Sequence, residues 1–298
     1  MFRSQPRWRL RSPPLYRLLN RFNLWKALAR RWRGLHLSIR ARLFAEDPPV
    51  HLFRPGMLRR LPAASGDTLL APVRIADCIR QLRDEGFWPG LQLAPAVVEE
   101  IRAFAAGASC SRHPDDPERF AVAEVRNGRT PAGAPVAVAD VNCAIPCAAI
   151  DRVAADPLLI GIIEAWLGYR PQQVKTRLYW SPVSDLPDDL RRENGQTVDF
   201  HYDIEPANAL YVFFYITAVD RESGAHVTLT GSHRGKSLPM IFSSSFQPEH
   251  RVLAHYGEAS QIIVEGGAGF GFLEDPATFH KALPPQKAER LVLQFRYS

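Results

Sequence analysis

The sequence predicts a mainly β protein with flanking helices, whose core is a double-stranded β-helix of the jelly-roll, cupin-like type. Two observations support this prediction. The second half of the chain contains a series of short apolar or alternating segments separated by turn residues, a pattern typical of closed antiparallel architectures. The first half instead carries apolar residues at helical spacing, so we expect helices to precede and flank the barrel.

Charge divides the chain into a basic extension and a larger globular domain. Of 298 residues, 46% are hydrophobic and 23% are charged, which is ordinary for a globular protein with a sizeable core. Residues 1–45 contain twelve Lys or Arg and no Asp or Glu, whereas the rest of the chain carries 25 basic and 31 acidic residues. We therefore expect a basic helical extension and linker at 1–66, followed by the double-stranded β-helix domain at 67–298.

The cysteine and hydropathy patterns indicate a cytoplasmic protein. The four cysteines form no C-x-x-C pair and no zinc-binding spacing, which fits a reducing compartment. No run of eighteen or more apolar residues is present, so we do not expect a transmembrane helix. Specific nucleic-acid binding is not expected either, and the sequence leaves the oligomeric state open.

An amphipathic helix is predicted at residues 13–33, with Ser12 as a suitable N-cap and Gly34 as a suitable stop. Trp25 and Trp32 lie in its apolar stripe, and basic side chains flank both edges of that stripe. This arrangement suits an anionic membrane surface, which would make the protein peripherally membrane-associated. A helix docked on the protein's own body or on a partner subunit fits equally well, and a mitochondrial-type presequence is a third alternative.

The remaining elements follow from apolar periodicity and turn residues. We expect a Pro/Gly-rich linker to Gly66, followed by two helices that end at Gly86 and Gly107, with a short strand at 91–93 between them. A surface loop at 108–118 and a strand at 120–125 come next. A hairpin turn at Asn127-Gly128 and a helix at 158–167 complete this half of the chain. The β region then comprises strands at 173–180, 210–217, 226–230, 261–264, 269–273 and 290–297. The acidic, proline-bearing loop at 182–196 is the expected lid.

The segment 200–203, Phe-His-Tyr-Asp, organises the candidate site. Because side chains alternate faces along a strand, His201 and Asp203 would project from the same side and could share one metal ion. The third ligand must come from elsewhere, and His280 is the best-placed candidate. Two histidines and one carboxylate, with open positions left over, form the facial triad of non-haem Fe(II) oxygenases.

Basic residues near this segment could hold an anionic cosubstrate. Arg290 opens an apolar run ten residues after His280, and its guanidinium fork matches a carboxylate. On the strand that precedes the expected lid, Lys175, Arg177 and Tyr179 share one face. These three could meet the C1 carboxylate of 2-oxoglutarate or an anionic substrate, or they could simply be the polar face of a strand.

The segment from about Leu70 to Ser298 resembles the phytanoyl-CoA dioxygenase family of Fe(II)/2-oxoglutarate oxygenases. Besides the residues already named, the resemblance rests on four motifs, which are Asp84–Phe87 with the helix after it, Asp156–Leu159 through Gly168, Glu222–Gly224, and Gly231–Gly235. The resemblance implies that Fe(II), 2-oxoglutarate and O2 are the cofactor and cosubstrates.

By the same resemblance, His201, Asp203 and His280 bind iron, and Arg290 binds the distal carboxylate of 2-oxoglutarate. Many relatives have Ser or Thr two residues after the arginine, where this chain has Val292, so the second cosubstrate donor is unassigned. The implied activity is hydroxylation of an unidentified small-molecule or lipid-linked substrate. The alternative is a non-catalytic or 2-oxoglutarate-independent metal-binding barrel that acts as a binding or membrane-associated module.

Overall fold

The fold is that of a computed structural model, which describes residues 58–60, 66–113, 116–142, 147–171, 173–203, 209–237, 239–240 and 243–298. The helix predicted at 13–33 lies outside these residues, as does the rest of the basic extension up to residue 57. The division of the chain at residue 66 therefore stays a prediction.

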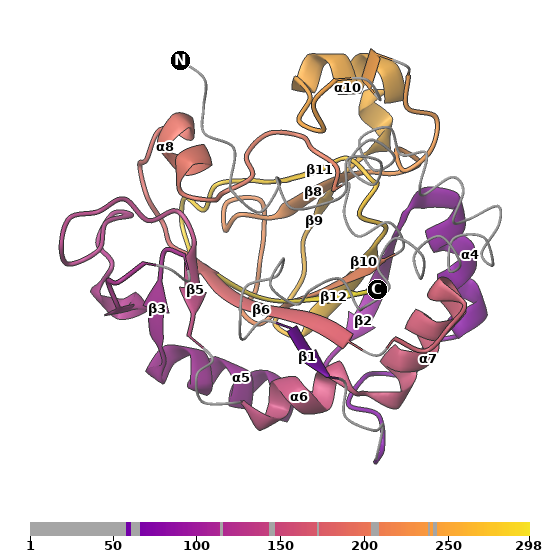
Figure 1. The fold of residues 1–298 in the computed structure, drawn as a ribbon, viewed down its shortest axis with the longest axis horizontal. Coiled ribbons are helices and arrows are strands. Elements are labelled where there is room, and N and C mark those ends of the chain that lie inside the picture. Colours follow the sequence, from indigo (N-terminus) through magenta and orange to yellow (C-terminus); the bar gives the residue numbers. More distant parts are fainter. Residues whose placement is uncertain are drawn as a thin grey trace, which may run out of the picture.

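Two antiparallel sheets face each other in the described part of the chain (Figure 1). Among the described residues, the larger sheet has nine strands in the order β2-β10-β7-β12-β6-β5-β3-β4, with β1 paired to β6, and the smaller sheet has the order β11-β8-β9. The strands are β1 (Leu58–Arg60), β2 (Phe87–Gln92), β3 (Ser109–Ser111), β4 (Phe120–Ala121), β5 (Ala139–Val141), β6 (Gln173–Ser181), β7 (Leu210–Tyr215), β8 (His226–Leu229), β9 (Gln261–Val264), β10 (Phe270–Glu274), β11 (His280–Ala282) and β12 (Arg290–Tyr297).

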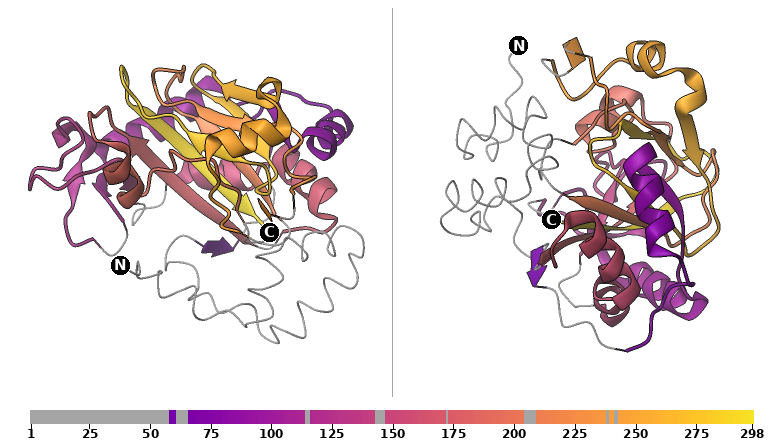
Figure 2. Two further views of the ribbon diagram at one scale, coloured as in Figure 1. Left: turned by 90° about the horizontal axis from the view of Figure 1, so that it is seen from above. Right: turned by 90° about the vertical axis from the view of Figure 1, so that its right-hand side faces the viewer.

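Helices cover the outer side of the larger sheet, on the face away from the smaller sheet (Figure 1). They are α4 (Ile75–Glu85), α5 (Pro95–Gly107), α6 (Ala148–Ala154) and α7 (Pro157–Leu167). Two shorter helices, α8 (Asp188–Glu193) and α10 (Glu249–Tyr256), lie elsewhere. Figure 2 shows α10 on the far side of the smaller sheet from α5, α6 and α7, so the molecule is layered as helices, sheet, sheet and helix.

The alternation of side chains along β12 separates two cores. Leu291 and Leu293 belong to the cluster that packs against the covering helices. Val292 belongs to a second cluster, with Phe213, that lies between the two sheets. Because alternate residues of a strand share a face, Arg290 at the start of β12 also faces the space between the sheets. The two-residue period thus places a buried cation inside the barrel.

Helix ends follow the capping residues of the sequence. As predicted, α4 stops at Gly86, which has the left-handed φ of 75°. The helix α7 begins after Asp156, whose carboxylate accepts hydrogen bonds from the backbone N–H groups of Leu158 and Leu159. It ends at Gly168, also left-handed. Local hydrogen-bonding chemistry therefore sets these boundaries.

The strand expected at 120–125 is shorter than predicted. Only Phe120–Ala121 is a strand, and Val122–Glu124 forms a turn of 3₁₀-helix. The Glu124 carboxylate accepts a hydrogen bond from the backbone N–H of Ala121 at 2.7 Å. This side-chain acceptor satisfies a backbone group that a longer strand would have paired, so the alternating pattern does not extend the sheet.

Replacing Gly86 with alanine should destabilise the fold more than a matched replacement elsewhere. A Cβ atom at Gly86 would lie 2.5 Å from both His233 Nδ1 and Thr278 Oγ1, in a residue with positive φ. Left-handed strain and overpacking together should lower the free energy of unfolding by about 2–5 kcal/mol. Gly195→Ala is the control, because Gly195 has a φ of +82° but no atom within 4 Å. Urea unfolding should show a clearly larger loss for Gly86→Ala, and equal losses would contradict the packing argument.

Candidate metal centre

Three possible metal ligands converge at one edge of the smaller sheet. His201, Asp203 and His280 each offer one ligand atom, and these atoms all lie within 4.8 Å of one another. His280 is the first residue of β11, whereas His201 and Asp203 lie in the segment between α8 and β7. Backbone hydrogen bonds join the two segments, from His201 N–H to His280 O at 3.0 Å and from His280 N–H to His201 O at 2.8 Å. The constellation has the composition of a facial triad.

The prediction that His201 and Asp203 lie on a regular strand is wrong. His201 forms only isolated bridges, with Phe246 and His280, and the backbone N–H of Asp203 donates to Pro276 O at 2.8 Å. The partners of this segment therefore come from separate loops and from the short β11, which cannot build a continuous ladder. The extended backbone nevertheless brings the ligand atoms of both residues to one place.

The two imidazole rings are oriented by backbone carbonyls. His201 Nδ1 lies 3.2 Å from Asp199 O, and His280 Nδ1 lies 2.9 Å from Thr278 O. Each Nδ1 is therefore assigned as the donor, which leaves the Nε2 lone pair of each ring available as a ligand. His201 Nε2 is 3.9 Å from Asp203 Oδ1, a separation that one shared metal ion can bridge.

The protonation states of the three side chains suit a divalent cation. Burial lowers the pKa of His201, and it lowers the pKa of His280 to about 4, so both imidazoles are neutral at physiological pH. Burial alone would raise the pKa of Asp203. The positive charge of Arg296 and a hydrogen bond from Tyr211 act against burial, and the pKa of Asp203 falls to about 2. Neutral imidazoles and an ionised carboxylate are the forms that bind metals.

The outer oxygen of Asp203 is held by residues of the larger sheet. The Tyr211 hydroxyl donates to Asp203 Oδ2 at 2.8 Å, and Arg296 Nη1 lies 3.9 Å from the same oxygen. The Arg296 guanidinium in turn lies 4.6 Å above the Tyr211 ring. Because Oδ2 is engaged in this way, Oδ1 is the oxygen that faces the imidazole of His201. These partners favour one-oxygen coordination by Asp203.

Arg290 is buried between the sheets and is only partly satisfied. Its Nη1 donates to Gly224 O, and its Nη2 donates to Ser181 Oγ at 3.1 Å. Its Nε has no hydrogen-bond partner among the described residues. A buried donor without an acceptor is unfavourable, so one more acceptor, such as a carboxylate oxygen, would complete this site. The arginine therefore fits the distal end of a small dicarboxylate.

The structure places Lys175, Arg177 and Tyr179 on β6, with the same strand parity as Ser181 and therefore on the face toward the smaller sheet. All three are half-buried. Arg177 Nε donates to the Asp140 carboxylate at 2.6 Å, and its guanidinium lies 4.4 Å above the Tyr179 ring. These contacts do not test the predicted role in cosubstrate binding, which stays a prediction.

No protein-family model and no curated protein matches the chain. Solved structures do. EvdO2 from Micromonospora carbonacea var. aurantiaca, in complex with 2-oxoglutarate, is 16% identical with a TM-score of 0.52, and the match covers 77% of this chain and 92% of EvdO2. The epimerase SnoN, in complex with Fe3+, alpha ketoglutarate and nogalamycin RO, is 17% identical with a TM-score of 0.50, covering 75% and 82%.

The chain has the fold of these two proteins. The predicted fold class, mainly antiparallel β with flanking helices, is therefore confirmed for the described residues. The finer resemblance to the phytanoyl-CoA dioxygenase family stays a prediction. None of the helices within the described ranges combines the length and apolar character that crossing a bilayer requires.

A buried polar cluster that was not predicted from the sequence lies beside the triad. Glu274 on β10 is fully buried, and one of its oxygens accepts a hydrogen bond from Thr228 Oγ1 at 2.7 Å and lies 3.2 Å from His226 Nε2. Its other oxygen lies 3.2 Å from His226 Nε2 and 3.6 Å from His280 Nδ1, and it accepts no hydrogen bond of good geometry from the described part of the chain. The only sequence signal was parity, since Phe272 and Glu274 share a face of β10.

In the metal-free protein, Glu274→Gln should remove a pH-dependent loss of stability. Burial raises the pKa of Glu274 to about 7, so the folded state retains a proton that the unfolded chain releases near pH 4.5. The wild type should therefore lose up to about 3 kcal/mol relative to the variant as pH rises from about 4.5 to about 7. Urea unfolding at several pH values measures this difference, with the exposed Glu193→Gln as control. A difference that does not change with pH would contradict the assignment.

A buried arginine makes hydrogen bonds within the loop that we expect to act as a lid. Arg191 of α8 donates to Leu186 O at 2.7 Å, to Ser184 O at 2.6 Å and to Gln196 Oε1 at 3.0 Å. These bonds give the segment 182–196 a defined shape built around α8. Its closure over the metal centre stays a prediction.

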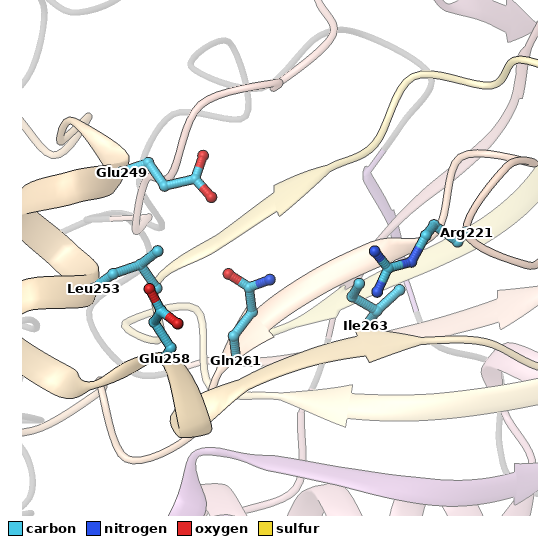
Figure 3. Close-up of a pocket in the computed structure, with 6 residues that line it drawn as sticks. All are labelled: Arg221, Glu249, Leu253, Glu258, Gln261 and Ile263. Atoms are coloured by element: carbon cyan, nitrogen blue, oxygen red, sulfur yellow. The ribbon is translucent and has the colours of Figure 1, made fainter.

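A hollow of about 420 Å³ lies between α10 and β9, apart from the triad. Figure 3 shows two carboxylates at one side of it and an arginine toward the other. Its lining residues are Arg221, Glu249, Leu253, Glu258, Gln261 and Ile263. None of the predicted site residues lines it, so the candidate chemistry belongs to the triad and not to this hollow.

Proposed function

We propose that the protein is an Fe(II)/2-oxoglutarate-dependent dioxygenase that hydroxylates a small-molecule or lipid-linked substrate. The observation that carries the proposal is the convergence of the neutral imidazoles of His201 and His280 with the ionised carboxylate of Asp203. The fold shared with EvdO2 and SnoN supports it, because their structures contain 2-oxoglutarate, with Fe3+ in the case of SnoN. The resemblance to the phytanoyl-CoA dioxygenase family points the same way.

In this proposal, Nε2 of His201 and His280 and Oδ1 of Asp203 hold the iron, and Arg290 pairs with the distal carboxylate of 2-oxoglutarate. When bound, iron, 2-oxoglutarate and O2 supply the oxidising chemistry. The chain itself holds the metal ligands in position and limits the access of water to the metal centre. Tyr211 holds the outer oxygen of Asp203, and the aromatic cluster between the sheets keeps the surroundings apolar.

Two features distinguish this proposal from its alternatives. The carboxylate of Asp203 favours hydroxylation over halogenation, since halogenating relatives replace that ligand with a small residue. The buried and partly unsatisfied Arg290 favours a cosubstrate-dependent enzyme over a barrel that binds only metal. In a barrel that never binds 2-oxoglutarate, the Nε–H donor of this buried arginine would lack an acceptor, which is energetically unfavourable.

The deciding experiment is cosubstrate binding by the full-length protein. Calorimetry on Ni(II)-loaded protein should show one 2-oxoglutarate bound per chain. Metal-free protein should bind 2-oxoglutarate much more weakly, because one end of the molecule would chelate the metal. His280→Ala provides the background. Absence of metal-dependent binding would contradict the proposal and favour the metal-only barrel. Oxygen-dependent succinate release, screened against candidate compounds with Fe(II) bound, would then identify the substrate, and a product with one added oxygen atom would establish hydroxylation.

We also propose that the basic extension brings the protein to an anionic membrane surface. Twelve basic and no acidic residues in 1–45 support this, with Trp25 and Trp32 in the apolar stripe of 13–33. Each basic residue near an anionic bilayer contributes about 1 kcal/mol, which salt weakens. Full-length protein should therefore sediment with anionic but not neutral vesicles, and a chain beginning at Pro62 should remain in solution. Equal sedimentation of both chains would favour docking on the protein's own body.

A further inference from the structure

Two neighbouring arginines of the larger sheet face inward, and one of them, Arg296, lies beside the metal centre. Arg177 on β6 and Arg296 on β12 have the same strand parity as Ser181 and Arg290, so they face the space between the sheets. Their side chains are nevertheless 27% and 30% exposed, and that of Asp203 is 26% exposed. Solvent therefore still reaches these inward-facing side chains, and that of Arg296 lies beside the outer oxygen of Asp203.

Arg177 is held in place at Nε, and its two terminal nitrogens carry further N–H donors. Its Nε donates to the Asp140 carboxylate at 2.6 Å, and its guanidinium lies 4.4 Å above the Tyr179 ring. No described residue accepts a hydrogen bond from its two terminal nitrogens. A guanidinium fixed by an acid on one edge and an aromatic ring on one face is pre-organised to bind an anion through its other edge.

Arg296 is arranged in the same way. Its guanidinium lies 4.6 Å above the Tyr211 ring, and Nη2 donates to Gln294 Oε1 at 3.3 Å. Its Nη1 lies 3.9 Å from Asp203 Oδ2, which is beyond hydrogen-bonding distance. In the antiparallel register Arg177 lies opposite Gln294, so Arg177 and Arg296 are diagonal neighbours whose Cα atoms lie about 7–8 Å apart. One carboxylate or phosphate could contact both.

The two ends of β12 give this pair and the proposed cosubstrate anchor different neighbours. Arg290 donates to Gly224 O and to Ser181 Oγ, and Ser181 lies directly opposite it on β6. Arg296 stacks on Tyr211, which lies directly opposite it on β7. We assign the distal carboxylate of the cosubstrate to Arg290, which leaves the Arg177–Arg296 pair for a different anionic group.

We propose that Arg177 and Arg296 bind an anionic group, a carboxylate or a phosphate, of the primary substrate. The proposal rests on the proposed function, because it assigns the cosubstrate to Arg290 and the metal. The C1 carboxylate of 2-oxoglutarate has the same chemistry as the proposed ligand, and it is the alternative occupant of Arg177. The site lies beside Asp203, so an anion held there would place the adjoining carbon atoms of the substrate next to the metal centre.

The test uses inorganic phosphate as the probe and full-length, Mn(II)-loaded protein. Bound Mn(II) broadens the phosphorus NMR signal of phosphate only at close range, so broadening reports an anion near the triad. In the wild type, broadening should persist when 2-oxoglutarate is saturating. The main variant combines Arg177→Gln with Asp140→Asn, so that no carboxylate is left without its partner. It should bind phosphate at least about tenfold more weakly, while 2-oxoglutarate affinity changes less than about twofold.

Two further variants make the result interpretable. Arg170→Gln removes an exposed arginine that pairs with Glu164 at 3.1 Å, and it should bind phosphate like the wild type. Arg177→Lys keeps the charge and should retain part of the phosphate binding, even if the double variant folds poorly. The proposal is overturned if wild-type phosphate is not broadened. It is also overturned if 2-oxoglutarate displaces phosphate and the double variant loses 2-oxoglutarate affinity. Failure of the proposed function would appear separately, as wild-type protein that does not bind 2-oxoglutarate at all.

Discussion

Replacing His201 or Asp203 with alanine should abolish stoichiometric Fe(II) binding. Each change removes one of three ligand atoms that lie within 4.8 Å of one another, and the remaining pair cannot cap one face of a metal ion. Loss of residues that only support the ligands typically costs 10- to 100-fold in metal affinity, so loss of a ligand itself should cost more than about 100-fold. Anaerobic equilibrium dialysis followed by metal analysis gives the content and the affinity directly.

The exposed histidine His250 provides the control, because His250→Ala removes an imidazole outside the triad. Its metal content should equal that of the wild type. Circular dichroism should show that both triad variants fold, since their side chains make few structural hydrogen bonds. Unchanged iron content in both His201→Ala and Asp203→Ala would show that the metal binds elsewhere.

The sequence predicted those parts of the fold that depend on local chemistry. The strands at 261–264 and 290–297 coincide with β9 and β12, because alternating apolar residues and nearby turn residues define them. The hairpin turn at Asn127-Gly128 also forms, with both residues at positive φ. In these cases the signal lies within a few residues of the element it determines.

Elements that depend on distant partners could not be predicted in the same way. The segment of His201 and Asp203 looked like a strand, but its backbone hydrogen bonds run to separate parts of the chain. The partners are Ser245, Gln247, Pro276 and His280. The role of Glu274 was hidden for the same reason. Its environment is made by His226 and Thr228 of another sheet, and only the assembled barrel brings them together.

The pairing of β12 with its neighbours explains why two arginines on the same face of this strand have different surroundings. Along β12, the residues that face the covering helices are apolar, whereas Arg290 and Arg296 face the interior at opposite ends. Their even-numbered positions on β12, which Val292 shares, account for the inward direction of both. The sequence could not predict that Arg290 would be enclosed by Gly224 and Ser181, or that Arg296 would border Asp203. Those neighbours follow from the register with β6 and β7.

Arg290→Ala should weaken 2-oxoglutarate binding while leaving Fe(II) bound. The arginine is buried, and its partly unsatisfied guanidinium would form a charge-assisted contact with the distal carboxylate. Removing one partner of such a pair costs on the order of 2–5 kcal/mol, which is a loss of affinity of about 30-fold or more. Calorimetric titration of Ni(II)-loaded wild type and variant measures this loss, and metal analysis of separate samples loaded anaerobically with Fe(II) measures iron retention.

Two comparison variants separate charge from geometry. Arg290→Lys keeps the charge but loses the planar fork, so its affinity should lie between those of the wild type and the alanine variant. Ser181→Ala removes the acceptor of Nη2 without touching the cosubstrate, and its effect should be small. If Arg290→Ala binds 2-oxoglutarate as tightly as the wild type, the anchor must be another inward-facing cation. Arg296 is then the first candidate, which would also contradict its assignment to the primary substrate.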